Sequence, residues 1–135
     1  MRKSNFLFGI FLLLASNSFA QEIEVEDPEA ANSYKVANLQ VLNKTTAKTS
    51  LLEIKVGEKA NFSGIDISVR KCWQAPLDQR PESKILIDVS EIKIDEKKEE
   101  RKVRIFYGWI FASSPSLSGL EHPIYDIVAV GCKNK

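Results

Sequence analysis

The chain has 135 residues, with 19 Lys and Arg side chains against 18 Asp and Glu, so its formal net charge is +1. Such a near-neutral balance, without a basic stripe, argues against nucleic acid as a partner. The length suffices for one domain with a single hydrophobic core, but not for two.

The first twenty residues have the three parts of a secretory signal peptide. Arg2 and Lys3 give the positive start, Phe6–Ala15 is an apolar run, and Ser-Phe-Ala at 18–20 offers a cleavage site. We expect cleavage after Ala20 and a periplasmic or secreted mature chain. A transmembrane helix needs roughly 20 apolar residues, which neither this run nor any later segment reaches, so no transmembrane segment is expected after cleavage.

Residues 21–38 are expected to form an acidic, flexible leader. They contain one proline and few large apolar groups, which is typical of a solvated tail; the alternative is an interaction arm. Residues 39–135 then form a single β-domain. The leader carries five carboxylates: Glu22, Glu24, Glu26, Asp27 and Glu29.

The chain has two cysteines, Cys72 and Cys132. Two cysteines in an exported chain have one possible pairing, and an oxidising compartment makes the disulfide the default. The alternative, a redox-active or metal-binding thiol pair, lacks the CxxC spacing that would support it. We therefore expect one disulfide that ties the C-terminus to the middle of the chain.

From Leu39 onward, apolar residues alternate with polar ones, which predicts half-buried strands. Two positions break the alternation. Cys72 falls on the polar side of the pattern that precedes it, and the apolar parity flips between Val89 and Ile92. A β-bulge is the ordinary way to shift a strand in this manner, so a bulge is expected near each position.

The stretch 103–111 is apolar on both faces, with Trp109 and Phe111 on one face and Ile110 on the other. We expect it to be a central strand, with Trp109 and Phe111 in the core; 124–130 is similar and shorter. No segment after the signal has a helical period. The prediction is an all-β fold, a small antiparallel sandwich or partly open barrel of about seven strands, closed by one disulfide.

Residues 112–123 connect these two strands and are rich in turn formers, yet they include Leu117 and Leu120. A fully solvated loop would not need two leucines. We therefore expect an ordered Ω-like loop that both leucines pin to the core.

Three stretches of the sequence resemble a known family. They are GWIFASSPSLSGLEHPIYD, followed by the last cysteine, and the earlier LNKTTAKTSLLEIKVGE and GIDISVRKCW. Together they are similar to the exported alphaproteobacterial family called domain of unknown function 2155, over nearly all of residues 39–132. The resemblance implies an exported single domain with these two cysteines, and it implies no particular chemistry.

One hypothesis for the 112–126 loop is a small envelope hydrolase. Such an enzyme needs a base within hydrogen-bond reach of the attacking hydroxyl and a carboxylate that orients the base. Against it, the loop has no GxSxG nucleophile elbow, and a small β-domain leaves little room for an oxyanion hole. The candidates are His122 as base, Asp126 as its carboxylate, and Ser114 or Ser116, with Ser113 and Ser118, as nucleophile.

A metal site is the second hypothesis for the loop. One histidine with two carboxylates, His122 with Glu121 and Asp126, is thin support for it, because metal sites draw three or four ligands from well-separated positions. We expect no metal and no cofactor. A structural role for His122, in a hydrogen bond to a loop carbonyl, is the favoured alternative.

A binding surface is the third hypothesis and the one we adopt. Trp73, brought near the last strand by the disulfide, is placed with Tyr107, Trp109 and Tyr125 at one edge of the sheet, and the predicted binding residues are Trp73, Tyr107, His122 and Tyr125. Aromatic side chains with a polar tip are typical anchors for sugars or proteins. For Trp73 and Tyr125 a place in the core is the alternative. The predicted function is an exported non-enzymatic β-domain that binds an envelope component, protein or glycan.

Overall fold

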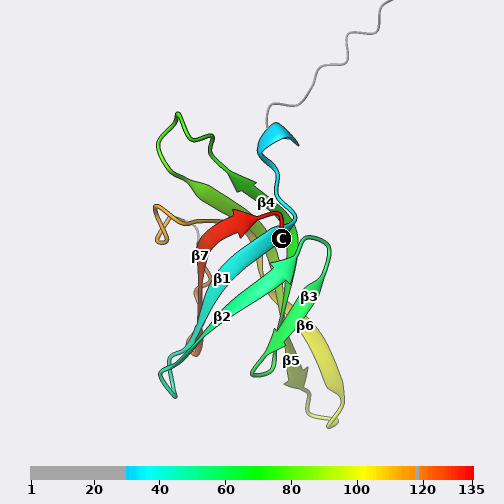
Figure 1. Cartoon of the computed structure of the whole chain (residues 1–135). Helices are drawn as coiled ribbons and strands as arrows, with labels where there is room; N and C mark the ends of the chain where they lie inside the picture. Colours follow the sequence, from blue (N-terminus) through cyan, green and yellow to red (C-terminus); the bar gives the residue numbers. More distant parts are fainter. Residues whose placement is uncertain (1–29, 118) are drawn as a thin grey trace, which may run out of the picture.

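The computed structural model describes residues 30–117 and 119–135. The predicted signal peptide, residues 21–29 of the predicted leader, and Ser118 lie outside these residues. The described part has one short 3-10 helix, η1 (Ala30–Asn32), and seven strands (Figure 1). The strands are β1 (Val36–Asn43), β2 (Lys48–Lys55), β3 (Lys59–Phe62), β4 (Ile65–Gln74), β5 (Ser83–Ile94), β6 (Glu100–Phe111) and β7 (Tyr125–Lys133).

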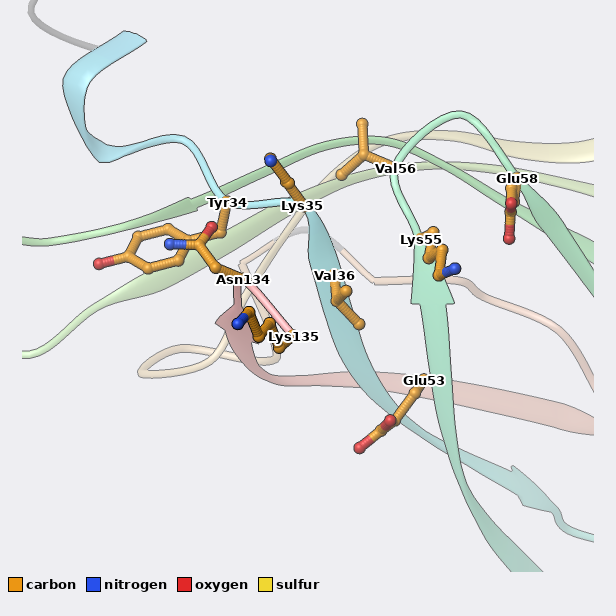
Figure 2. A pocket seen from close by; sticks show the side chains of 9 residues that line it. All are labelled: Tyr34, Lys35, Val36, Glu53, Lys55, Val56, Glu58, Asn134 and Lys135. Atoms are coloured by element: carbon orange, nitrogen blue, oxygen red, sulfur yellow. The ribbon is translucent and has the colours of Figure 1, made fainter.

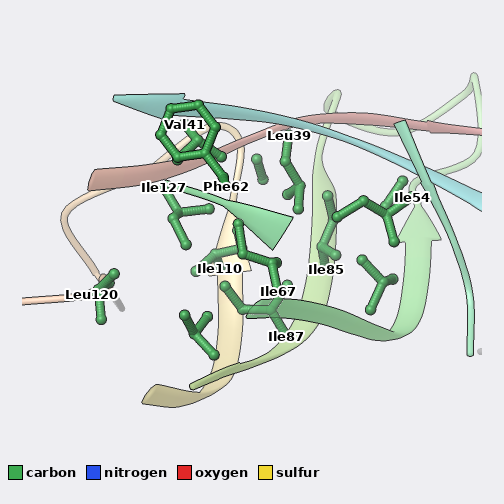
Figure 3. Close-up of a cluster of buried hydrophobic side chains, with 14 of the residues drawn as sticks. Leu39, Val41, Ile54, Phe62, Ile67, Ile85, Ile87, Ile110, Leu120 and Ile127 are labelled. Atoms are coloured by element: carbon green, nitrogen blue, oxygen red, sulfur yellow. The ribbon is translucent and has the colours of Figure 1, made fainter. Parts of the chain in front are cut away.

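The strands form two antiparallel sheets, with the orders β2-β1-β7 and β3-β4-β5-β6. Figure 1 shows the three-stranded sheet lying across the four-stranded one. Alternate residues of both sheets point into one shared interior, where side chains such as Leu39, Ile67 and Ile87 are fully buried (Figure 3). The predicted all-β architecture is confirmed as a sandwich.

The first strand begins at Val36, three residues before the predicted boundary at Leu39. Val36 and Ala37 are buried and pair with β2 on one side and β7 on the other. The segment before them lies along the end of β4, where the short β3 leaves the strand edge uncovered. There Ser33 forms an isolated bridge with Trp73, and the amide of Tyr34 donates a 2.8 Å hydrogen bond to the carbonyl of Cys72.

The bulge predicted near Cys72 occurs in β4, but the change of parity predicted in β5 between Val89 and Ile92 does not occur. In β4 the register with β5 shifts between Val69 and Lys71, so Arg70 is an additional residue, as expected. At Val89/Ser90 the register also shifts, but the additional residue is Ile105 of β6. The exposed Ile92 and Ile94 therefore stay on the outer side of β5. A third shift, with Val130 additional in β7, was not predicted.

The predicted disulfide between Cys72 and Cys132 is confirmed, with 5.9 Å between the two α-carbons. It joins β4 to β7, and so it connects the two sheets across one end of the interior. Closing a loop with a sequence separation of 60 residues stabilises the fold by about 4 kcal/mol in the chain-entropy model. This is a large fraction of the free energy of unfolding of a whole domain, which is typically roughly 5–15 kcal/mol.

The predicted central position of the aromatic strand is wrong, because β6 and β7 each stand at the end of a sheet order. The inward positions of β6 are Phe106, Gly108 and Ile110, which pair with the buried residues of β5. Trp109 and Phe111, expected in the core, are half-buried on the outer side. The sequence pattern alone could not assign the faces, because both faces of this strand are apolar.

Candidate functional site

The outer side of β4, β5 and β6 carries a group of aromatic and charged side chains that we call the aromatic face. The register places Trp73 beside Lys84, and Lys84 beside Phe111. The next positions along β6 are Trp109, opposite Leu86, and Tyr107, opposite Asp88. The face consists of Arg70, Lys71, Trp73, Lys84, Leu86, Asp88, Arg104, Tyr107, Trp109 and Phe111.

Lys84 holds the two tryptophans of the face together. Its Nζ lies 4.8 Å from the ring centroid of Trp73 and 5.0 Å from that of Trp109. A cation over the negative face of an aromatic ring is attracted by the ring quadrupole, and indole gives the strongest attraction. Because Lys84 is on the strand between them, these contacts fix both half-buried rings at the sheet surface.

An ion pair fixes the other end of the face. Asp88, with 9% of its side chain exposed, accepts hydrogen bonds from Arg104 Nε and Nη2 at 2.9 and 2.8 Å, and from Arg70 Nη2 at 3.3 Å. Burial raises the pKa of Asp88, but the hydrogen bonds and charges of Arg104 and Arg70 outweigh burial and hold that pKa below its ordinary value. Arg104 also lies 5.1 Å from the ring centroid of Tyr107.

Of the four predicted binding residues, Trp73 and Tyr107 share this face, and His122 and Tyr125 do not. Tyr125 is 7% exposed and belongs to the core. Its ring packs edge-on against Phe62 with 6.5 Å between centroids, and its hydroxyl donates to the carbonyl of Ser63. Tyr125 therefore supports the tight turn between β3 and β4 from inside the sandwich.

His122 closes the 112–124 loop onto the domain. Its Nδ1 accepts hydrogen bonds from the amides of Ile124 and Tyr125 at 3.1 and 3.3 Å, so Nε2 carries the proton of the neutral ring. Nε2 faces Glu91 Oε2 at 3.4 Å, and the His122 carbonyl accepts from Lys44 Nζ at 3.0 Å. The structural role expected for His122 thus uses amides and Glu91 in place of a loop carbonyl.

The hydrolase candidates are not brought together in the described residues. Both ring nitrogens of His122 face partners other than a serine. The hydroxyl of Ser113 donates to Glu82, Ser114 accepts from the Leu117 amide through its carbonyl, and Ser116 is exposed. Along β7, burial alternates so that Asp126 lies on the side opposite to Tyr125.

Two glutamates that the sequence analysis did not single out anchor this loop. Glu91 occupies an inward position of β5, opposite the buried Ile65, and meets His122 there. Glu82 accepts from the amides of Ser83 and Ser113 at 2.9 and 3.1 Å. Burial raises the pKa of Glu82, but the hydrogen bonds from Ser113 and its neighbours lower it to a net value below the ordinary one. Because Glu91 comes two residues after the buried Val89, the alternation of the strand predicts that Glu91 points inward. No pattern in the sequence indicates the role of Glu82.

The two loop leucines have different roles. Leu120 is 5% exposed and belongs to the core, as predicted, whereas Leu117 is 74% exposed, so the prediction that it pins the loop is wrong. The polar contacts of Ser113 and His122 replace the second leucine as anchors. The loop is therefore held at both ends by hydrogen bonds and in its second half by one buried side chain.

A groove of about 780 Å³ lies at the end of the sandwich near the C-terminus (Figure 2). Figure 2 shows that its side chains come from the start of β1 and the segment before it, from β2 and the turn after it, and from the last two residues. Among the described residues, five of the nine that line it are Lys or Glu and one, Tyr34, is aromatic, and most of the lining surface is apolar. The lining residues are Tyr34, Lys35, Val36, Glu53, Lys55, Val56, Glu58, Asn134 and Lys135.

In residues 30–117 and 119–135, no three His, Cys, Asp or Glu side chains lie closely enough together to hold a metal ion, so Glu121, His122 and Asp126 do not form such a group. The same part contains no helix that is long and apolar enough to cross a membrane.

Replacing Asp88 with Asn should lower the free energy of unfolding at neutral pH by about 1 kcal/mol, a value reduced by the solvent exposure of both arginines. The folded-state pKa of Asp88 lies below the ordinary value of 3.8, which it takes in the unfolded chain. Its stabilisation is therefore complete above about pH 4 and is lost as the pH falls through the folded pKa. Urea unfolding at several pH values measures this; Asp78→Asn, in the exposed β4–β5 loop, is the control. A difference from the parent that persists undiminished in acid would contradict the ion-pair assignment.

Replacing His122 with Ala should lower the free energy of unfolding by about 1–2 kcal/mol, because two amides lose their acceptor. Asn offers a side-chain acceptor to the amides two and three residues ahead, so His122→Asn should restore most of the loss. Hydrogen exchange at Ile124 and Tyr125 is the second measurement and should be fast only in the alanine variant. Equal losses in both variants would show that His122 does not act through these hydrogen bonds.

One family model matches most of the chain. Residues 37–132 match the family described as an uncharacterized protein conserved in bacteria, DUF2155. A protein of Rickettsia prowazekii (strain Madrid E), named Uncharacterized protein RP359, is 36% identical over 100 residues, which cover 74% of this chain and 62% of that protein. The chain thus spans less than two thirds of the relative's length, and no solved structure gives a significant match. The chain belongs to the DUF2155 family, which confirms the resemblance found in its sequence.

Proposed function

We propose that this chain is an exported, non-enzymatic β-domain that binds an envelope component, protein or glycan, in the periplasm or outside the cell. The N-terminal signal pattern supports export. The disulfide between the two sheets supports an oxidising compartment, since such bonds form and persist there and are rare in the cytosol.

The observation that carries the binding function is the aromatic face. Tyr107 is 55% exposed, and Trp73, Trp109 and Phe111 are half-buried beside it on the same side of the sheet. Aromatic side chains are usually buried, and their presence together at a surface marks an interaction site. The rings are held in place before any ligand arrives, because Lys84 and the Asp88 ion pair fix their neighbours. Preorganisation of this kind reduces the entropic cost of binding.

The other two candidate regions support binding less well. In the 112–124 loop, Leu120 and His122 face the domain and Ser113 is tied to Glu82, so these side chains already have structural partners. The groove near the C-terminus is lined mainly by long Lys and Glu side chains of opposite sign. Such side chains lose much rotamer entropy when a ligand orders them.

Photo-crosslinking tests this proposal directly. A benzophenone amino acid replaces Tyr107 in the full-length chain, expressed in its native envelope, and the products are identified by mass spectrometry. We expect a discrete crosslinked partner, because the ring at this position contacts the ligand. The same spectra should show a mature chain that begins at Gln21.

The matched control places the benzophenone at Leu51, which is 73% exposed on the outer side of the other sheet. This position should give no partner or only diffuse products. The same partner captured equally from both positions, or from Leu51 alone, would refute a role for the aromatic face.

A further inference from the structure

We propose that the ligand of the aromatic face is an acidic polysaccharide, a chain of sugar rings that bear carboxylate groups. This inference rests on the proposed function, because it names the ligand class of the same face. It follows from how aromatic rings and cations alternate across the three strands.

The aromatic rings fit a chain of sugars. Tyr107 and Trp109 lie two residues apart on one side of β6, which places them about 7 Å from each other along the strand. Trp73 lies two strands away, on β4, across Lys84. Sugar rings present C–H groups on their flat faces, and these carry a partial positive charge that stacks well on the negative face of an aromatic ring. Sugar rings can therefore stack along β6, on Tyr107 and Trp109, and across the sheet, from Trp109 to Trp73.

The charges of the face fit a carboxylated ligand. The face has four cations, Arg70, Lys71, Lys84 and Arg104, and one carboxylate, Asp88. On the same outer side, in the row of Arg104, Asp66 pairs with Lys102 at 3.4 Å, so cations still outnumber carboxylates there. Arg104 uses two N–H groups on Asp88, while a guanidinium has five, and its side chain is 61% exposed. Arg104 can therefore bind Asp88 and still donate to a second carboxylate. Lys71 is exposed next to Leu86 and adds a further cation.

A protein partner fits this alternation less well. The buried centre of a protein interface is depleted of charged residues, and covering this face would dehydrate Lys71 and Lys84 between the aromatic rings. A narrow sugar chain can stack on the rings while the ammonium groups stay hydrated. A nucleic acid would also meet rings and cations, but a chain with a formal net charge of +1 lacks the overall basic charge typical of such binders.

The test uses the oxidised, mature chain and four polymers as probes in calorimetry. The first is polygalacturonate, and the second is its methyl ester, which keeps the same sugar backbone and loses the charge. Poly-aspartate supplies carboxylates without sugar rings, and oligothymidylate supplies a stackable polyanion of another class. We expect polygalacturonate to bind at least about tenfold more tightly than each of the others, a difference of about 1.4 kcal/mol.

Three variants connect this binding to the face. Tyr107→Ala and Trp109→Ala should each weaken polygalacturonate binding about tenfold. Lys71→Gln should weaken it about threefold and reduce its salt dependence between about 0.05 and about 0.5 M NaCl. The controls are Leu51→Ala on the other sheet and Lys97→Gln in the β5–β6 turn, both exposed, which should bind like the parent. Tyr107 and Lys71 are exposed, so their variants remain informative if Trp109→Ala is poorly folded.

The outcomes separate this inference from the proposed function. Equal binding of polygalacturonate and its methyl ester, or tighter binding of poly-aspartate or oligothymidylate, would overturn the inference. Absence of binding to all four polymers would also overturn it, and a protein crosslinked at Tyr107 would then leave the proposed function standing. Binding that is unchanged in Tyr107→Ala and Lys71→Gln would place any polysaccharide site elsewhere and overturn the inference, whereas the crosslinking at Tyr107 would still decide the proposed function.

Discussion

One additional residue in β4, Arg70, determines which side chains of the following part of this strand face the interior and which face solvent. Because Arg70 has no partner in β5, the strand turns over at this point, and Cys72 enters the core while Trp73 moves to the outer side. The inward cysteine reaches Cys132 and joins the two sheets, and the outward tryptophan joins Trp109 around Lys84. The disulfide and the aromatic face are thus two consequences of a single bulge.

The aromatic face and the 112–124 loop differ in the charged side chains that fix them. On the aromatic face, cations organise the surface, with Lys84 between the indole rings and two arginines on Asp88. In the long loop, carboxylates do this work instead, with Glu82 on Ser113 and Glu91 on His122. The loop therefore resembles a structural closure, and the cationic aromatic surface is the part of the domain to which we assign the proposed binding function.

The sequence predicted the fold class, the disulfide and the bulge at Arg70, because alternation, cysteine number and a parity break are local signals. It did not predict the orientation of β6, because a strand with apolar residues on both faces has no pattern that chooses the inward one. For the same reason, Trp109 and Phe111 were expected in the core but are half-buried on the outer side, whereas Tyr125 was expected at the surface but is buried. The contacts of Glu91 with His122 and of Glu82 with Ser113 each span 31 residues of sequence. Alternation with the buried Val89 indicates that Glu91 points inward, but no local pattern indicates which residue either glutamate contacts.

Counting free thiols in a variant that lacks Arg70 shows whether the bulge turns Cys72 inward. Deletion of Arg70 should turn Cys72 outward, so that two free thiols are found after unfolding without reductant, while Arg70→Ala and deletion of Asp78 from the β4–β5 loop should both leave none. An Arg70 deletion that still forms the Cys72–Cys132 bond as completely as the parent would contradict this expectation, because the bulge would then not be what turns the cysteine inward.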